Sequence, residues 1–222
     1  MVCIPQRARK SGCDQFIKCL RELVLDIGCT DQKLRPFLSK DTTYIGLDYY
    51  HTATYWYKTQ PQIYGDAQAL PFPDSSMNSV LLLDVLEHIP DPNKCLREIH
   101  GVLIPDGTLV LQVLFLYPIH NAPLNSRCWT AYGLRILAQN HGFAITQESP
   151  IGNSLETATL LTNIAYSQTV LNWISNKNPL AILGLLLPLT VPCVNTFAWV
   201  LAKFSLPKSI MPHSYRITLV KT

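Results

Sequence analysis

Acidic side chains stand at the ends of short apolar runs in the first half of the chain. The first run, residues 23–28, carries Asp26 and ends in Gly28, which is typical of a buried parallel strand that enters a tight turn. The next three runs also end in carboxylates: Asp48, Asp66 and Asp84. Ligands of parallel α/β sheets bind beyond the carboxyl ends of the strands. A carboxylate at the tip of the second strand is therefore placed to accept hydrogen bonds from ribose hydroxyls.

The elements that must position these carboxylates alternate between strands and helices. Strands are predicted over residues 23–28, 43–48, 63–66, 79–84, 108–116, 143–147 and 214–220. Helices are predicted over residues 14–22, 30–40, 51–59, 92–103, 131–141 and 154–175. Asp91 is a suitable N-cap for the helix that begins at Pro92, and Gly142 suits the end of the next helix. The alternation predicts an α/β fold with a mainly parallel sheet.

Seven short motifs follow one another along these elements at regular intervals. They are Val24–Cys29, Tyr44–Asp48, Gly65–Ala67, Leu70–Asp74, Val85–Pro92, Leu96–Ile99 and Val102–Gly107. This series resembles the class I S-adenosylmethionine-dependent methyltransferases of type 11, which are similar to quinone-biosynthesis methyltransferases, over about residues 22–148. The resemblance implies a Rossmann-like three-layer sandwich with a seven-stranded, mainly parallel sheet, and S-adenosyl-L-methionine as the cofactor.

The resemblance also implies a cofactor site at the strand ends. The residues that it carries over are Asp26, Gly28, Cys29, Asp48, Asp66, Ala67, Asp84 and Val85. It places the first turn at the methionine end of the cofactor, Asp48 at the ribose hydroxyls, and Asp66 at the adenine amino group. Asp84 and Val85 are implied to line the methionine and the site of transfer. A strand-end cap is the alternative role for Asp66 and Asp84.

The first turn departs from the family pattern. The family loop runs Gly-x-Gly-x-Gly, whereas its second and third glycines are here Thr30 and Gln32. A positive φ is costly for a β-branched residue such as Thr30, so the loop is expected either to bind the cofactor more weakly or to follow another path. A non-catalytic binding or scaffold protein is therefore an alternative to the enzyme. A nicotinamide-dependent oxidoreductase is disfavoured because its G-x-G-x-x-G turn is missing.

Two histidines are candidates for acid–base chemistry on a methyl acceptor. His88 follows the fourth predicted strand and His120 follows the fifth. Methyl transfer from a sulfonium is an in-line displacement, which needs a general base only where the acceptor carries a proton of high pKa, as a hydroxyl does. The alternative is that His120 hydrogen-bonds the backbone of its loop and that His88 helps to fix its turn. Glu87 is expected to brace that same turn.

Charge is distributed unevenly between the two halves. The 222 residues carry 18 Lys and Arg against 15 Asp and Glu, a net charge of +3, and residues 1–100 hold 23 of these 33 side chains. Charged residues make up 15% of the chain, below the roughly 25% of typical soluble domains. The 48% of hydrophobic residues excludes a disordered chain, and the modest net charge argues against a nucleic-acid partner.

The seven cysteines indicate a reducing compartment rather than a disulfide framework or a metal centre. Their number is odd, no two form a C-x-x-C pair, and no histidine pair lies beside them at zinc spacing. No signal peptide is recognised at the start of the sequence given. We therefore expect no bound metal and a cytoplasmic protein, with peripheral attachment to a membrane as an alternative.

The charge deficit is concentrated in an apolar segment before the last predicted strand. Residues 178–202 contain no charge, and Pro179, Pro188 and Pro192 are expected to divide them into short helical pieces. Three alternatives are a helical cap that forms an apolar acceptor pocket, an interfacial membrane hairpin, and a membrane span. The expected division is a cofactor-binding core over residues 1–150, the apolar helical insertion over 151–207, and the last core strand over 208–222.

The predicted function is methyl transfer from S-adenosylmethionine to a small or lipid-like acceptor. Oxygen is the preferred acceptor atom, and the apolar insertion is expected to select the acceptor.

Overall fold

The computed structural model describes residues 17 and 20 and residues 22–119, 125–204 and 210–222. Most of the helix predicted over residues 14–22, and the candidate base His120, lie outside the described residues.

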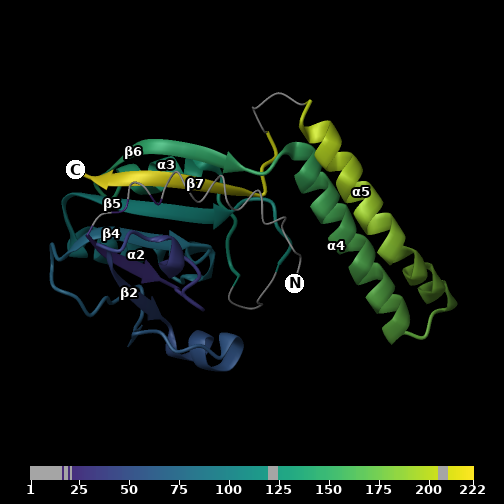
Figure 1. Cartoon of the computed structure of the whole chain (residues 1–222), viewed down its shortest axis with the longest axis horizontal. Helices are drawn as coiled ribbons and strands as arrows, with labels where there is room; N and C mark the ends of the chain where they lie inside the picture. Colours follow the sequence, from purple (N-terminus) through teal and green to yellow (C-terminus); the bar gives the residue numbers. More distant parts are fainter. Residues whose placement is uncertain (1–16, 18–19, 21, 120–124, 205–209) are drawn as a thin grey trace. The chain divides into compact units, whose positions relative to one another are not determined.

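A seven-stranded sheet confirms the predicted α/β fold. Its strands are β1 (Leu23–Ile27), β2 (Thr43–Asp48), β3 (Ile63–Tyr64), β4 (Met77–Leu83), β5 (Leu103–Leu114), β6 (Phe143–Ile151) and β7 (Ser214–Lys221). They are arranged in the order β3-β2-β1-β4-β5-β7-β6. The neighbouring pairs from β3 through β5 are parallel, whereas β7 runs opposite to β5 and β6 (Figure 1). The sheet is Rossmann-like and mainly parallel, as the resemblance implies.

Both faces of the central strands are buried, because their side chains alternate between two apolar clusters. Leu25 and Ile27 of β1 belong to the larger cluster, which includes side chains of α2 (Pro92–Val102) and α3 (Ala131–Gln139). Val24 belongs to the smaller one. The central strands are therefore covered by apolar side chains on both faces of the sheet.

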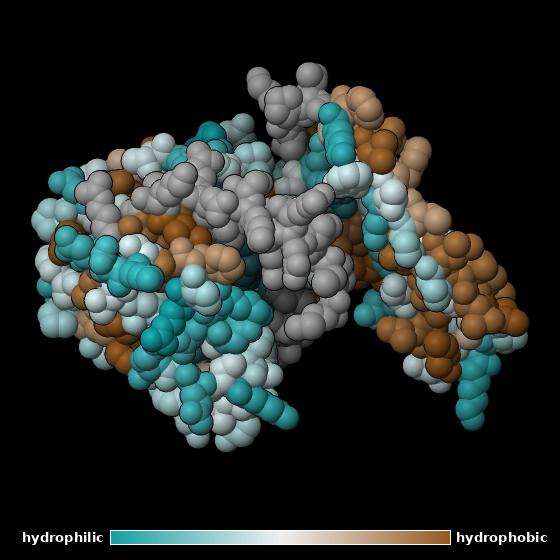
Figure 2. Space-filling view, viewed as in Figure 1, coloured by the Kyte–Doolittle hydropathy of each residue, from teal (hydrophilic) through white to brown (hydrophobic). Residues whose placement is uncertain are grey.

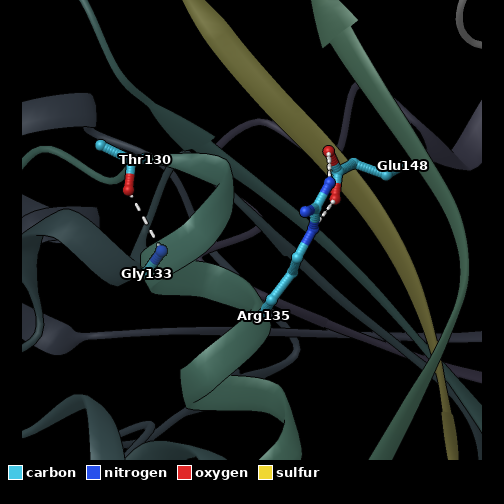
Figure 3. A network of polar contacts seen from close by, with 4 residues as sticks. All are labelled: Thr130, Gly133, Arg135 and Glu148. Atoms are coloured by element: carbon cyan, nitrogen blue, oxygen red, sulfur yellow. Dashed lines mark hydrogen bonds and ion pairs between the residues drawn. The ribbon is translucent and has the colours of Figure 1, made fainter.

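Side-chain hydrogen bonds cap the first turns of α2 and α3. The Asp91 carboxylate accepts from the backbone N–H groups of Asn93 and Lys94, so the predicted N-cap of α2 is confirmed. In α3 the Gly133 N–H donates to the Thr130 hydroxyl at 3.1 Å (Figure 3). Arg135 then joins α3 to β6 through a two-pronged ion pair with Glu148, at 2.8 and 2.9 Å (Figure 3).

The helix predicted over residues 30–40 is wrong. The only helical turn there is the short 3-10 element η1 (Arg35–Phe37). Thr30 and Gln32 have positive φ angles of 44° and 55°, which an α-helix cannot contain. The helix predicted over 51–59 is present as the π-helical turn η2 (Thr52–Tyr57).

The start of the fifth strand also differs from the prediction. Residues 105–107 were expected to separate helix and strand, but α2 ends at Val102 and β5 begins at once. Met77 pairs with Leu103 and Ser79 with Thr108, so residues 104–107 form a bulge in the strand. A bulge accommodates Pro105, which cannot donate to the ladder, and the positive φ of 58° at Asp106.

The chain divides into two compact units, the first holding the sheet with α2 and α3. The second comprises the described parts of residues 114–120 and 150–214. Its helices are α4 (Ser154–Ser175), as predicted, η4 (Pro179–Leu186) and α5 (Leu187–Ala202). The expected break at Pro192 is wrong, because this proline lies inside α5. Pro188 occupies the first turn of α5, where the N–H group that proline lacks has no helical partner in any case.

Candidate active site

The turn after β1 passes directly against the end of β4. Gly28 has a φ of 75°, and its N–H and that of Cys29 donate to the Leu47 carbonyl at 2.8 and 3.2 Å. A Cβ atom at Gly28 would collide with the Val85 side chain, so only glycine fits this approach. The structure thus brings together two of the predicted cofactor residues, Gly28 and Val85.

The loop retains left-handed backbone at the two positions where glycine was replaced. Gln32 closes a turn by donating its N–H to the Cys29 carbonyl at 2.7 Å. Thr30 turns its N–H back toward β2, where it donates to Asp48 Oδ2 at 2.9 Å. The positive φ of both residues shows that the loop keeps a glycine-type path despite their side chains. Each such residue costs roughly 1–2 kcal/mol of conformational strain.

Asp48 is the best-fixed carboxylate of the site. It is 3% exposed, and its second oxygen accepts from the Tyr49 N–H at 2.8 Å. Burial raises the pKa of the Asp48 carboxyl, whereas the N–H groups of Thr30 and Tyr49 oppose that shift by stabilising the anion. Each carboxylate oxygen can accept a second hydrogen bond, so the group retains capacity for two ligand hydroxyls.

Asp26 and Cys29 lie behind the turn. The Tyr44 hydroxyl donates to Asp26 Oδ2 at 2.6 Å. Burial raises the pKa of Asp26 to about 6, with Tyr44 lowering it and the nearby Asp48 carboxylate adding to the rise. The Cys29 side chain is buried near Gly46, and burial raises the pKa of its thiol to about 12. The thiol is therefore protonated, and sequence reasoning missed Tyr44 as the partner of Asp26.

Asp66 and Ala67 form the turn after β3. Asp66 Oδ1 accepts from the Gln68 N–H at 2.8 Å and from the Gln68 side-chain amide at 3.3 Å. The Gln68 side-chain oxygen in turn accepts from the Asp91 N–H at 3.0 Å. Ala67 is buried. Gln68 thus connects the predicted adenine-binding turn to the start of α2, a role that its position in the sequence did not indicate.

Asp84 occupies the tip of β4 in a left-handed conformation, with a φ of 56°. Its two carboxylate oxygens accept from the Gln112 side-chain amide at 3.0 and 2.9 Å. The Gln112 side-chain oxygen accepts from Arg216 of β7 at 2.6 and 3.0 Å. This polar chain across three strands orients Asp84, and it leaves the exposed carboxylate at the edge where Val85 follows.

Ser126 and Arg127, which precede α3, hold the turn that follows β4. The Ser126 N–H and hydroxyl donate to the Glu87 carbonyl at 3.1 and 3.2 Å. The Arg127 guanidinium donates to the carbonyls of Ile89 and Pro90 at 2.7 and 3.0 Å. His88 lies half-buried in this turn. The other candidate base, His120, lies outside the described residues.

The Glu87 side chain does not brace this turn, contrary to expectation. It is fully buried, and neither carboxyl oxygen has a hydrogen-bond partner within the described part of the chain. Burial, reinforced by the charge of Asp84, raises the pKa of Glu87 to about 8. The turn is held instead by the hydrogen bonds from Ser126 to the Glu87 backbone carbonyl and by Arg127. A charged carboxylate at this depth would be costly, which is why the side chain favours its protonated form.

A family model described as a methyltransferase domain matches residues 25–111. This match covers the first turn, the carboxylates of β2 and β4, and the turn that contains His88. Residues 25–111 therefore form a methyltransferase domain. S-Adenosylmethionine is the cofactor of such domains.

Comparisons with individual proteins give the same domain. A 27-O-demethylrifamycin SV methyltransferase of Amycolatopsis mediterranei (strain S699) is 42% identical over 55 residues, 25% of this chain and 20% of that protein. The chain therefore matches only about a fifth of the length of this relative. This short match adds support for the domain, not for the reaction of the whole relative.

Solved structures share the fold over nearly the whole chain. An S-adenosylmethionine-dependent methyltransferase from Archaeoglobus fulgidus is 15% identical with a TM-score of 0.60, over 98% of this chain and 95% of that one. The [4+2]-cyclase SpnF is 16% identical with a TM-score of 0.59, over 97% of this chain and 82% of that one. Because one of these is a methyltransferase and the other a cyclase, the fold alone does not define the reaction.

The residues of the methyltransferase domain fit S-adenosylmethionine, which carries a sulfonium, an ammonium, a ribose and an adenine. The carboxylates at the strand ends offer negative charge to the cations, and Asp48 offers paired acceptors to the ribose hydroxyls. The first turn presents backbone at Gly28, where a side chain would collide. Among the described residues no group of three or more His, Cys, Asp and Glu side chains could hold a metal ion.

We expect Glu87→Gln to remove a pH-dependent part of the stability of this domain. The folded pKa of about 8 lies above the ordinary value of 4.5, so between these values the folded chain holds a proton that the unfolded chain has released. Raising the pH through this window therefore lowers the free energy of unfolding, by about 3 kcal/mol between about pH 6 and pH 9. The neutral amide does not titrate. Urea unfolding at both pH values measures the difference.

The exposed Glu22 provides the control, because Glu22→Gln should keep the pH dependence of the wild type. Equal pH dependence in Glu87→Gln and wild type would show that Glu87 ionises freely in the folded protein.

We expect Thr30→Gly to stabilise the domain by up to about 1 kcal/mol, because relief of the strained φ exceeds the entropy that a glycine loses on folding. Thr42 is not among the described residues that have a positive φ. Thr42→Gly should therefore destabilise the domain by about 0.5–1 kcal/mol. Urea unfolding of both variants measures the two signs. Destabilisation of equal size in both would contradict the strain assigned to the loop.

Proposed function

We propose that the chain is an active S-adenosylmethionine-dependent methyltransferase that acts on a small or lipid-like acceptor, with oxygen as the preferred acceptor atom. The observation that carries this proposal is the Thr30-to-Asp48 hydrogen bond of 2.9 Å. It forms in the loop where Thr30 and Gln32 keep strained, left-handed backbone. A loop that had lost its role in a scaffold protein would have no reason to keep that conformation.

The cofactor, when bound, supplies an electrophilic methyl group on a sulfonium. The residues of the domain bind and orient it in this proposal: Asp48 accepts from the ribose hydroxyls and Asp66 from the adenine amino group. Asp26, Cys29 and Ala67 are proposed to support these contacts, with the Asp26 carboxylate held by the Tyr44 hydroxyl. Gly28, Asp84 and Val85 form the wall at the methionine end. Alignment of the acceptor with the methyl group then supplies most of the rate enhancement.

The apolar second unit supports an apolar acceptor. Its exposed side chains include many leucines and aromatic rings, and such surfaces favour ligands that avoid water. A hydroxyl acceptor needs a base, and His88 or His120 is proposed to take its proton. The described cysteines that are free thiols, Cys29, Cys95, Cys128 and Cys193, support placement in the reducing cytoplasm.

Calorimetric titration with S-adenosylmethionine tests the cofactor site. The wild type should bind at micromolar concentration, and Asp48→Asn should bind about tenfold or more weakly, because hydrogen bonds to a carboxylate are stronger than those to an amide. Asp41→Asn removes an exposed carboxylate just before β2 and should bind like the wild type. Absence of wild-type binding at millimolar cofactor would favour the scaffold protein.

The two histidines are proposed to act on the acceptor, so His88→Gln and His120→Gln should bind S-adenosylmethionine within about twofold of wild type. The same titration measures this. A loss of tenfold or more in either variant would instead assign that histidine to the cofactor.

A further inference from the structure

The helical hairpin of the second unit presents a large apolar surface. The segment Pro179–Ala202, which comprises η4 and α5, is 24 residues long with a mean hydropathy of 1.9 over its most apolar 18 residues, and none of that window is buried. Ile182, Leu185 and Phe197 are 68%, 77% and 66% exposed. Brown apolar side chains cover much of the hairpin in the space-filling view (Figure 2). Length and composition alone would also suit a buried core helix, which this exposure excludes.

Many polar side chains of the hairpin are satisfied within it. Tyr166 of α4 donates its hydroxyl to the Leu183 carbonyl at 2.9 Å, and the Asn163 amide donates to the Asn195 side chain at 2.8 Å. Five hydroxyls donate to the carbonyl four residues earlier, at 2.8–3.0 Å: those of Thr162, Thr169, Ser175, Thr190 and Thr196. These hydroxyls do not need water as an acceptor, as a segment in contact with lipid requires.

The two arms of the hairpin are held together by close packing. A Cβ atom added to Gly184 of η4 would lie 2.5 Å from Val170 of α4, so the backbone of η4 lies directly on that side chain. Val170 is buried, in contrast to the outward apolar side chains. The hairpin is therefore a preformed structure with one apolar seam inside and a second apolar surface outside.

The charges around this surface have a single sign. Glu156 is the last acidic residue of the chain, whereas Lys177, Lys203 and Lys208 flank the apolar segment. The Lys203 ammonium lies 3.5 Å from the centre of the Trp199 ring. An amphipathic tryptophan beside a lysine suits the boundary between acyl chains and anionic headgroups, where the ring and the ammonium find their preferred surroundings.

The exposed side chains of α4 mix polar with apolar residues. They include the side-chain amides of Gln168 and Asn172 beside Leu171 and Ile174, which are 54% and 57% exposed. In the hydrocarbon centre of a bilayer these amides would be bare, which disfavours a hairpin that crosses the membrane. An arrangement parallel to the surface keeps α4 in water and buries η4 and α5 in lipid.

We infer that the hairpin is a membrane anchor, in which the outer face of η4 and α5 inserts into one leaflet of an anionic bilayer while α4 faces the headgroups and water. This inference concerns attachment and is independent of methyl transfer.

Flotation of the full chain with vesicles tests this inference. The wild type should float with phosphatidylglycerol–phosphatidylcholine vesicles and less with pure phosphatidylcholine. The double variant Leu185→Lys/Phe197→Lys should lose at least tenfold in partitioning, although its added positive charge favours the anionic surface. The matched variant Gln168→Lys/Asn172→Lys carries the same charge on α4 and should float at least as well as the wild type.

Thiol labelling gives a second readout. Cys193 of α5 and Cys128 of the first unit are both exposed. Anionic vesicles should protect Cys193, but not Cys128, from a membrane-impermeant maleimide. All variants should bind S-adenosylmethionine like the wild type, so that failure of the anchor and failure of the cofactor site are distinguishable.

Three outcomes would overturn the anchor. The first is a wild type that remains below both kinds of vesicle, and the second is equal flotation of Leu185→Lys/Phe197→Lys and wild type. The third is concentration-dependent self-association without vesicle binding, which would show that a second copy covers the apolar face. Loss of flotation in Gln168→Lys/Asn172→Lys would reject the orientation parallel to the surface in favour of a crossing hairpin.

Discussion

The hydrogen bond from the Thr30 N–H to the buried Asp48 carboxylate is the contact on which the candidate site depends. It joins the turn after β1 to the tip of β2, and Thr30 and Gln32 of that turn have left-handed backbone. In the same turn Gly28 lies against Val85 at the tip of β4. Three strand ends thus meet at this turn, at a conformational cost that glycine would have avoided.

Several carboxyl groups gather at this edge of the sheet, and burial opposes their ionisation. Burial raises the pKa values of Asp26 to about 6 and of Glu87 to about 8, and each rise is increased by a neighbouring aspartate. Carboxyl groups with raised pKa values in one region cluster at functional sites more often than elsewhere. A bound cation would stabilise the ionised forms, so this edge is electrostatically prepared for a ligand of positive charge.

Sequence patterns predicted the strands, the α/β class and the strand-end carboxylates, because these depend on local hydrophobic runs and on the shared edge of parallel strands. They failed where a few backbone angles decide the structure: at residues 30–32, in the bulge of β5, and at Pro192. Contacts between distant residues were also missed. Gln112 and Arg216 are separated by 104 residues, and nothing in either neighbourhood indicates that they meet. Likewise, the support that Arg127 gives to the turn after β4 arises only when the chain folds.

The low charge of the hairpin is consistent with the way its hydroxyl groups are satisfied. In α5 the hydroxyls of Thr190 and Thr196 donate to the helix's own carbonyls. The leucines and Phe197 around them are exposed, so this face offers lipid apolar side chains and few unsatisfied hydroxyls. If the proposed acceptor is lipid-like, it would concentrate in the same bilayer, so attachment there would raise its local concentration around the methyltransferase domain without any additional contact to the acceptor itself.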